Sequence, residues 1–469
     1  MLSILGRGVR LCDGVSRREV LRIGGLGFTG LMWADLLRSR SARASEPSAK
    51  PQTAKGTFGK ARACIIVFNY GGPSHLDILD LKPDAPAEIR GEFKPATTRV
   101  PGVSITEHLP RLGALADRYA IIRSVSHRDN DHAIGAYLAL TGYSHPKHDI
   151  LGIEPPATPQ DMPALGSVVS RLRPARQPVF SYVTLGDLRH LGNNDGMGQY
   201  GGCLGRVHDP YTIPFTRPMD GSLDMGGVTA VLGEVDGLRV DGRRRLLEQV
   251  ERARPVLESD EGMRDLAAHK RRAYELLSSS ASREAFNLGK EPQRVRDAYG
   301  SSSFGHNCLL ARRLVEAGVP MVTVYSFGNR DWDTHGQNFR DLKNTLLPPT
   351  DQGLSALLQD LDSRGMLEDT LVLWMGDMGR TPRVNKSAGR DHWSFCYSIL
   401  LAGAGVKAGQ VYGSSDKSAA YPSTNPVSPT DIAATIYHCL GIDPATHITD
   451  QQERPFVACT GKPISAILS

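Results

Sequence analysis

Short, continuously apolar runs recur along the chain and alternate with segments of helical character. The apolar runs cover residues 63–68, 321–325, 371–375 and 398–403. The helical segments cover residues 309–317, 354–361 and 430–440. Continuous apolar strands are typical of a parallel sheet that is covered on both faces, and their alternation with helices is typical of α/β proteins. The pattern therefore predicts a doubly wound α/β sheet.

The middle of the chain has a different pattern. Residues 190–228 are rich in glycine and irregular, and residues 240–277 form a strongly charged helical pair that divides near Pro255. Acidic and basic residues are interspersed in this pair, which indicates a solvated helix face rather than a basic binding patch. We therefore expect a helical and irregular insertion at about residues 190–300.

The N-terminal segment has the features of an export signal. Ser16, Arg17 and Arg18 are followed by an apolar pair, as in twin-arginine signals. The apolar stretch at residues 23–37 is too short for a stable membrane span of ~20 residues, and small residues at 42–44 offer a cleavage site. An amphipathic helix or a membrane anchor is the alternative interpretation. We expect a signal at residues 1–44, a linker at 45–60, one domain at 61–465, and a periplasmic or secreted protein.

The positive charge of the chain belongs to this leader. The formal net charge is +5, and residues 1–44 alone contain eight arginines and three acidic residues, so the body is neutral. A neutral body without a recognition motif argues against nucleic-acid binding, and 40% hydrophobic residues exclude intrinsic disorder. Six cysteines follow the leader, and none forms a Cys-x-x-Cys pair, so a zinc ribbon is not indicated. An exported protein could form one or two disulfides among these cysteines, and the sequence does not show which of them pair.

Polar residues follow four apolar strand segments, at residues 63–68, 121–122, 321–325 and 371–375, and ligands of open α/β sheets bind at such strand ends. These groups are Gly71–Asp80, His127–His132, Asp331–His335, and Gly376–Arg380 with the nearby Gly389–Trp393. Aspartate and histidine from four strand ends form an oxygen and nitrogen ligand set suited to zinc, calcium or manganese. The sequence therefore predicts a metal site or an ester-hydrolysing cleft. A purely structural polar network is the alternative.

Several motifs, most of which overlap these groups, resemble a known bacterial family. They are Gly-Gly-Pro-Ser-His-Leu-Asp at 71–77, Ala-Arg-Arg-Leu-Val-Glu-Ala-Gly-Val at 311–319, Trp-Asp-Thr-His at 332–335, Gly-Arg-Thr-Pro at 379–382 and Gly-Arg-Asp-His-Trp at 389–393. From the leader to about Asp443 the chain resembles the family called domain of unknown function 1501, typically exported by the twin-arginine pathway. That family is grouped with the alkaline phosphatase and sulfatase superfamily. The resemblance implies an alkaline-phosphatase-like three-layer α/β/α sandwich of metal-dependent ester-hydrolase ancestry.

The chain departs from the superfamily pattern at three positions. The segment that begins with the nucleophilic cysteine in sulfatases and ends in Thr-Gly begins here with His132. In the Ser-Asp-His-Gly metal turn, Met378 replaces the histidine, and Asn69 occupies the position of the first-strand aspartate. The resemblance therefore implies the fold more directly than it implies a complete two-metal site.

The resemblance and the strand-end groups together suggest roles for individual residues. The metal, zinc or calcium, is assigned to Asp77, Asp333, His335, Asp377 and His392. His132 is assigned as nucleophile or general acid–base, with Arg380 beside it in catalysis. Arg390 and His127 are expected to contact the anionic substrate, since arginine binds such groups in a bidentate manner. A surface ion pair is the alternative for each arginine.

Two functions are consistent with these residues. The first is an exported metal-dependent hydrolase of sulfate or phosphate esters, possibly of extracellular polysaccharide. The second is a non-catalytic envelope protein that binds an anionic glycan or a partner in the same cleft. The expected partners are the twin-arginine export machinery and an anionic ester or glycan, without nucleic acid and without a stable membrane span.

Overall fold

The predicted sheet is present and has eight strands. The structure is a computed structural model, which describes residues 56–146, 156–177, 179–186, 188, 196–213, 284–326 and 332–469. The predicted signal with Ser16, Arg17 and Arg18, residues 45–55 of the predicted linker and most of the predicted insertion lie outside these ranges. Residues Gly56–Ser469 form one compact unit.

The strands of the main sheet follow the order β12-β4-β11-β8-β1-β7-β5-β6. Their bounds are β1 (Ala63–Asn69), β4 (Tyr119–Val125), β5 (Tyr182–Leu185), β6 (Tyr211–Ile213), β7 (Met321–Tyr325), β8 (Thr370–Gly376), β11 (Tyr397–Ala402) and β12 (Gln410–Tyr412). All neighbours are parallel except β11, which is antiparallel to both β4 and β8. The mostly parallel sheet expected from the apolar runs is therefore confirmed.

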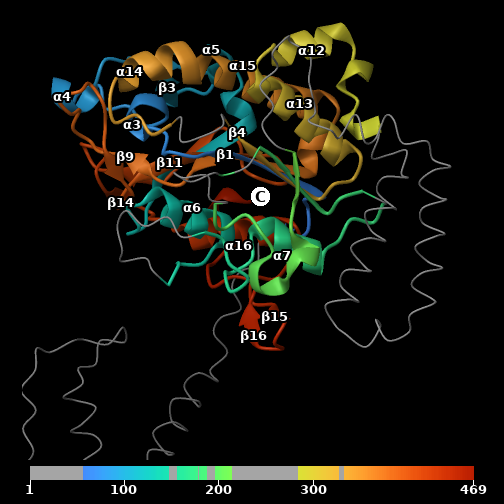
Figure 1. The fold of residues 1–469 in the computed structure, drawn as a ribbon. Coiled ribbons are helices and arrows are strands. Elements are labelled where there is room, and N and C mark those ends of the chain that lie inside the picture. Colours follow the sequence, from blue (N-terminus) through green and yellow to red (C-terminus); the bar gives the residue numbers. More distant parts are fainter. Residues whose placement is uncertain are drawn as a thin grey trace, which may run out of the picture. The chain divides into compact units, whose positions relative to one another are not determined.

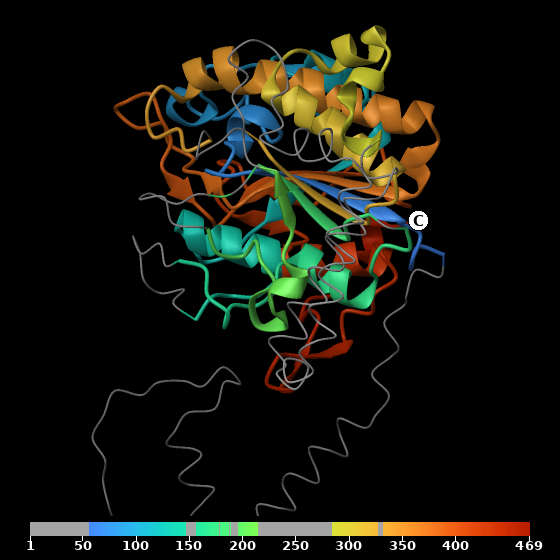
Figure 2. The same ribbon diagram turned by 45° about the vertical axis from the view of Figure 1, so that its right-hand side comes forward.

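Helices cover both faces of this sheet (Figures 1 and 2). One layer contains α3 (His75–Ile78), α5 (Pro110–Ala114), α12 (Gln293–Tyr299), α13 (Ser303–Glu316), α14 (Asn338–Asp341) and α15 (Leu347–Ser363). The opposite layer contains α6 (His132–Thr141), α7 (Leu165–Leu172) and α16 (Pro429–Cys439). This arrangement is the three-layer α/β/α sandwich that the family resemblance implies.

The alternation of side chains along β1 explains why the sheet needs both layers. Ile65 and Val67 belong to the core under α13 and α15, together with Leu309 and Leu354. Ile66, one position along, is equally buried and faces the other layer, because successive strand residues point to opposite faces. Burying a side chain of this size stabilises a protein by roughly 1.5–3 kcal/mol, so neither face can remain exposed.

The reversed strand β11 has a consequence for the site. Its first residue, Tyr397, lies at the same edge as the carboxyl ends of β4 and β8. Residues 391–395, which precede it, therefore reach that edge too. There β10 (His392–Trp393) pairs with β9 (Gly379–Arg380), which places His392 opposite Arg380.

The remaining α-helix and strand pairs are short. They are α4 (Ala87–Arg90) and the paired strands β2 (Pro95–Thr97) with β3 (Ser104–Thr106), β13 (Ser414–Ser415) with β14 (Pro422–Thr424), and β15 (His447–Thr449) with β16 (Pro455–Val457). In the part of the chain that the structure describes, no helix is long and apolar enough to cross a membrane.

Candidate metal site

Polar groups from four parallel strand ends meet at one edge of the sheet. Gly71 and Gly72 follow β1, and their backbone N–H groups donate to Asp377 Oδ1 at 2.9 and 3.0 Å. Asp377 directly follows β8, and its Oδ2 lies 2.5 Å from His132 Nδ1 at the start of α6. Asp333 follows β7 and lies 3.0 Å from His132 Nε2. The structure thus brings together the strand ends that the sequence singled out.

Three side chains converge closely enough to hold a metal ion. His132, Asp333 and His392 each direct one ligand atom into a group whose members all lie within 4.8 Å of one another. Asp333 Oδ1 lies 3.4 Å from His392 Nε2, and it is the oxygen that approaches His132. Two imidazole nitrogens and one carboxylate oxygen are a donor set typical of zinc. We call these residues the three-residue cluster.

In both histidines of the cluster, Nδ1 is hydrogen-bonded to a group outside the cluster, so that Nε2 faces the other ligand atoms. Asp377 accepts a hydrogen bond from His132 Nδ1, and the backbone carbonyl of Asn130 accepts one from His392 Nδ1 at 3.1 Å. Such outer partners orient metal-binding histidines and fix their tautomers. Asp131 caps α6 by accepting the Ala133 and Ile134 N–H groups, and this cap begins the helix at His132.

Burial and the neighbouring charges shift the pKa of His132 in opposite directions. The His132 side chain is only 1% exposed. Burial of the ring lowers the pKa of His132, but the Asp377 carboxylate and hydrogen bonds to Asp333 and Asp377 raise it overall. Burial raises the pKa of Asp333, whereas hydrogen bonds from His132 and His392 and the charge of Arg380 lower it overall. Without a metal, the pair of His132 and Asp333 is therefore shifted toward a positive imidazole beside a negative carboxylate.

His335 closes the solvent side of the cluster. Its Nε2 lies 3.1 Å from Asp333 Oδ1 and 3.0 Å from His392 Nε2, and its Nδ1 lies 2.7 Å from Asp391 Oδ1. The side chains of His335 and Asp391 are 47% and 52% exposed. The hydrogen bond from His335 is the main cause of the lowered pKa of Asp391. This pair is the accessible part of the site.

Arg380 lies beneath the cluster and is fully buried. Its Nη2 approaches Asp333 Oδ1 at 2.5 Å, and its Nε donates to the carbonyl of Gly72 at 3.0 Å. The backbone carbonyls of Gly71, Trp332 and Arg390 accept its other hydrogen bonds. Because the guanidinium is buried and engaged, Arg380 positions Asp333 and does not reach a substrate from solvent.

Asp77 and Arg390 form a buried ion pair with each other. Arg390 Nε and Nη2 donate to the two Asp77 oxygens at 2.8 and 2.9 Å, and both side chains are 0% exposed. Ser74 Oγ and Asn338 Nδ2 also donate to Asp77. The structure does not bring Asp77 to the three-residue cluster, and it leaves Arg390 no surface for a substrate. This pair joins α3 to the segment that precedes β10. Arg390 therefore forms an ion pair, as in the alternative interpretation, but the pair is buried instead of lying at the surface.

His127 and Asn69 also face protein groups. His127 Nε2 donates to the backbone carbonyl of Asp377 at 2.8 Å, while its Nδ1 accepts the Asp129 N–H. Burial lowers the pKa of His127 to about 4, so the ring is neutral near pH 7. Asn69 donates to the Met375 carbonyl. His127 therefore supports the backbone of the site and is not placed against a substrate.

Two residues that contact the site, Asp391 and Asn130, are not among those predicted from the sequence. Asp391 stands next to His392 in the sequence, yet its partner is His335, 56 positions earlier. Asn130 acts through its backbone carbonyl, which any residue type would supply. The only sequence signal for Asp391 was its place in the Gly-Arg-Asp-His-Trp motif.

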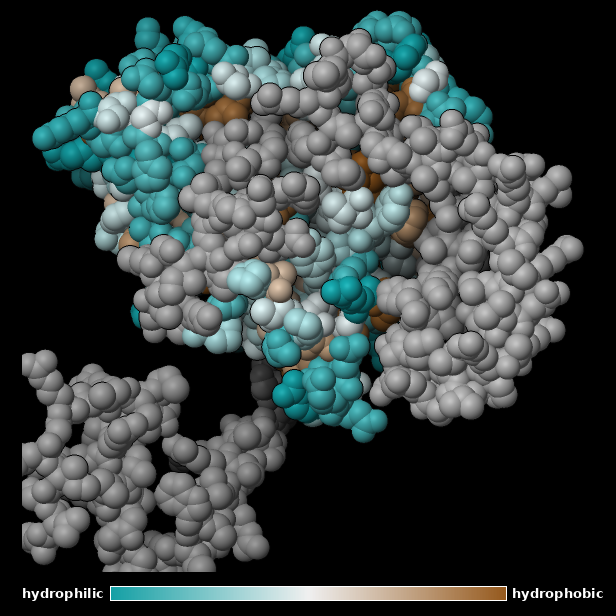
Figure 3. Space-filling view, viewed as in Figure 1, coloured by the Kyte–Doolittle hydropathy of each residue, from teal (hydrophilic) through white to brown (hydrophobic). Residues whose placement is uncertain are grey.

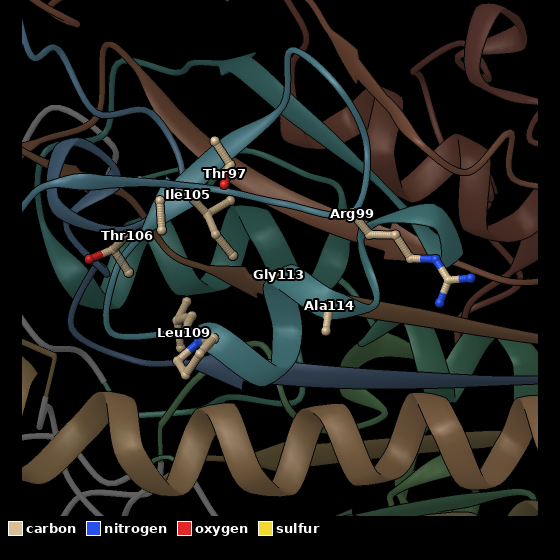
Figure 4. Close-up of a pocket in the computed structure, with 9 residues that line it drawn as sticks. Thr97, Arg99, Ile105, Thr106, Leu109, Gly113 and Ala114 are labelled. Atoms are coloured by element: carbon tan, nitrogen blue, oxygen red, sulfur yellow. The ribbon is translucent and has the colours of Figure 1, made fainter.

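A separate cavity of about 500 Å³ lies between the β2–β3 hairpin and α5. Figure 4 shows Ile105 and Leu109 at its wall and the Arg99 side chain extending away from them. Arg99 pairs with Asp117 at 3.3 Å. The cavity shares no residue with the three-residue cluster.

Comparison with known proteins identifies a family and a set of remote structural neighbours. The family model described as "Protein of unknown function (DUF1501)" matches residues 61–468, and no curated protein matches the chain. Ps i-CgsB in complex with k-i-k-neocarrahexaose is similar at 11% identity and a TM-score of 0.39, with 81% of this chain and 72% of that chain covered.

Two further solved structures are similar at the same level. PsFucS1 sulfatase from Pseudoalteromonas sp. has 12% identity and a TM-score of 0.35, with 82% of this chain and 68% of that chain covered. The phosphonate monoester hydrolase SpPMH from Silicibacter pomeroyi has 12% identity and a TM-score of 0.36, with 87% and 76% covered. These similarities are remote, so the chemistry of the site rests on the residues of this chain.

Proposed function

Because the chain belongs to the DUF1501 family of proteins of unknown function, we propose its activity from its own residues: an exported, metal-dependent hydrolase of sulfate or phosphate esters. The observation that carries this proposal is the convergence of His132, Asp333 and His392 within 4.8 Å, with an accessible histidine beside them. The predicted twin-arginine signal supports export, and an exported hydrolase would meet esters of extracellular polysaccharide.

The donor set of the cluster fits a resident metal. His132 Nε2, Asp333 Oδ1 and His392 Nε2 would hold it, and three protein ligands leave one position open, as in catalytic zinc sites. Calcium prefers six to eight oxygen ligands, so two imidazoles favour zinc. The bound metal would supply Lewis-acid catalysis of ester hydrolysis.

The residues around the cluster position the metal ligands or transfer protons. Asp377 fixes His132, and Arg380 fixes Asp333, so both act as positioning residues. His335 holds a proton at Nδ1 against Asp391 and directs Nε2 toward the cluster, and this geometry suits a general acid–base. Compared with the assignment from sequence, His132 moves to the ligand set and His335 takes the proton-transfer role.

One observation supports the alternative of a non-catalytic binding protein. The guanidinium of Arg380 lies 2.5 Å from Asp333 Oδ1 and 3.4 Å from His132 Nε2. A fixed positive charge at this place weakens the attraction of the cluster for a cation. A protein of this kind would use the same cleft to bind an anionic glycan without turnover.

A substrate screen separates the two functions. The purified protein, loaded with zinc, is assayed against aryl sulfate, phosphomonoester and phosphodiester substrates. The hydrolase predicts turnover of at least one substrate class, a loss of at least about 100-fold in His335→Ala, and no loss in the exposed control Lys462→Ala. Zinc binding without any turnover would support the binding protein instead.

A further inference from the structure

A second cavity is lined in part by the two loops that carry the accessible residues His335 and Asp391. Its volume is about 480 Å³, within the range of roughly 300–1,000 Å³ that is common for small-molecule sites. Gln337 and Ala388 line it, and each belongs to a loop that also carries site residues. The two loops are joined, since Asn385 Nδ2 donates to the His335 carbonyl and Arg390 N–H donates to the Thr334 carbonyl. We call this cavity the adjoining pocket.

Unfavourable backbone conformations gather around the adjoining pocket. Gln337 and Ala388 have φ values of 54° and 53°, and they are two of the six described non-glycine residues with positive φ. This conformation costs roughly 1–2 kcal/mol for a residue with a Cβ. Lys343 and Asn344 reach the pocket from a π-helical turn, Leu342–Leu346. Such irregularities recur at functional sites, where the surrounding structure maintains them.

The lining of the adjoining pocket is polar but balanced in charge. Glu92 and Glu107 stand opposite in sign to Arg340 and Lys343, so their formal charges cancel. The surface over α4 and α14, at the upper left of Figure 3, is hydrophilic. A lone sulfate or phosphate would need donors only, whereas this lining offers acceptors as well.

The floor of the adjoining pocket is aromatic. Phe93 and Phe339 line it with ring centroids 5.4 Å apart, and their exposed fractions are only 8% and 5%. A sugar ring has hydroxyl groups that both donate and accept hydrogen bonds, and a face of C–H groups that packs against aromatic rings. A neutral polyhydroxylated ring therefore matches the polar lining and the aromatic floor together.

We propose that the adjoining pocket binds a sugar unit that neighbours the ester-bearing unit of a glycan substrate. The proposal rests on the proposed function for the place of the ester, but sugar binding itself needs neither metal nor turnover. The cluster then takes the anionic ester, and the adjoining pocket selects the glycan that carries it.

Fluorescence anisotropy of metal-free, full-length protein tests this proposal. The probes are labelled hexasaccharides, neutral and sulfated, from agarose, cellulose, carrageenan and chondroitin sulfate. We expect saturable binding of at least one probe and a loss of at least about tenfold in affinity in the double variant Lys343→Ala/Asn344→Ala. Both side chains are exposed, so folding is retained, and the equally exposed Lys462→Ala is the matched control.

Three results would overturn the proposal. They are the absence of binding by every hexasaccharide, unchanged affinity in the double variant, and competition by inorganic sulfate as strong as competition by the unlabelled sugar. The last result would identify an anion site. Because the protein is metal-free, a missing metal or missing turnover would contradict the proposed function and leave the binding result standing.

Discussion

His132 and Asp377, 245 positions apart in the chain, lie with Nδ1 and Oδ2 2.5 Å from each other in the interior of the protein. The other carboxylate oxygen of Asp377, Oδ1, accepts hydrogen bonds from the N–H groups of Gly71 and Gly72. The carboxylate therefore couples the turn after β1 to the first residue of α6. It also fixes which ring nitrogen of His132 faces the cluster.

This relationship predicts the effect of Asp377→Asn. An amide oxygen still accepts from Gly71 and Gly72, but His132 loses its charged partner. Loss of such an outer partner typically lowers metal affinity about 10–100-fold. Competition with a chelator measures the zinc affinity of the variant. The matched variant Asp391→Asn leaves the His132 pair intact, and equal losses in both variants would contradict the role of Asp377.

The Asp77–Arg390 pair predicts a loss of stability rather than of metal. Arg390→Met leaves the Asp77 carboxylate buried and without its cation, which costs about 3–5 kcal/mol. Arg62→Met breaks a pair whose arginine is 84% exposed, and it should cost at most about 1 kcal/mol. Denaturant unfolding measures both variants. An Arg390→Met protein of unchanged stability would contradict the structural role of the pair.

The strained residue Ala388 predicts a stabilising substitution. Glycine adopts its φ of 53° without the Cβ penalty, so Ala388→Gly should stabilise the protein by about 0.5–1 kcal/mol after the greater chain entropy of glycine is included. Ala445→Gly, at an exposed residue without positive φ, should destabilise by a similar amount. Thermal unfolding that gives both variants the same sign would contradict the strain at Ala388.

The predicted signal makes the location of the protein testable. Twin-arginine export depends on the paired arginines, so Arg17→Lys/Arg18→Lys should retain the chain in the cytoplasm as an uncleaved precursor. Cell fractionation with detection of a C-terminal tag measures this. An Arg7→Lys/Arg10→Lys variant has the same change of residue type elsewhere in the leader and should export normally. Normal export of the first variant would contradict the twin-arginine proposal.

The sequence predicts the central strands to within one residue and their parallel direction, but it does not predict the reversal of β11. Its runs at 63–68, 321–325 and 371–375 correspond to β1, β7 and β8, because burial on both faces leaves a continuous apolar signal. The reversal of β11 depends on how the preceding loop returns to the sheet, and no local pattern encodes it. Helix α13 begins at Ser303, six residues before the predicted start. The Ser302 side chain caps this end of the helix by accepting a hydrogen bond from the Gly305 N–H.

The sequence also predicts which loops form the site but not how their side chains pair. Asp333, His335, Asp377 and His392 all belong to the assembled region. Arg380 and Arg390 look alike in the sequence, since each follows a glycine in a loop. Only the packing of those loops shows that both are buried and face Asp333 and Asp77. Arg380 pairs with a residue 47 positions earlier and Arg390 with one 313 positions earlier, and only the tertiary structure brings these residues together.

The metal content of the purified mature protein decides whether the three-residue cluster is a metal site. After incubation with zinc and removal of the free metal, elemental analysis should find near-stoichiometric zinc in the wild type and in Lys462→Ala. His392→Ala, which removes one of the three converging ligand atoms, should retain little. A correctly folded wild-type protein that holds no zinc or other divalent metal would show that His132, Asp333 and His392 do not form a metal site.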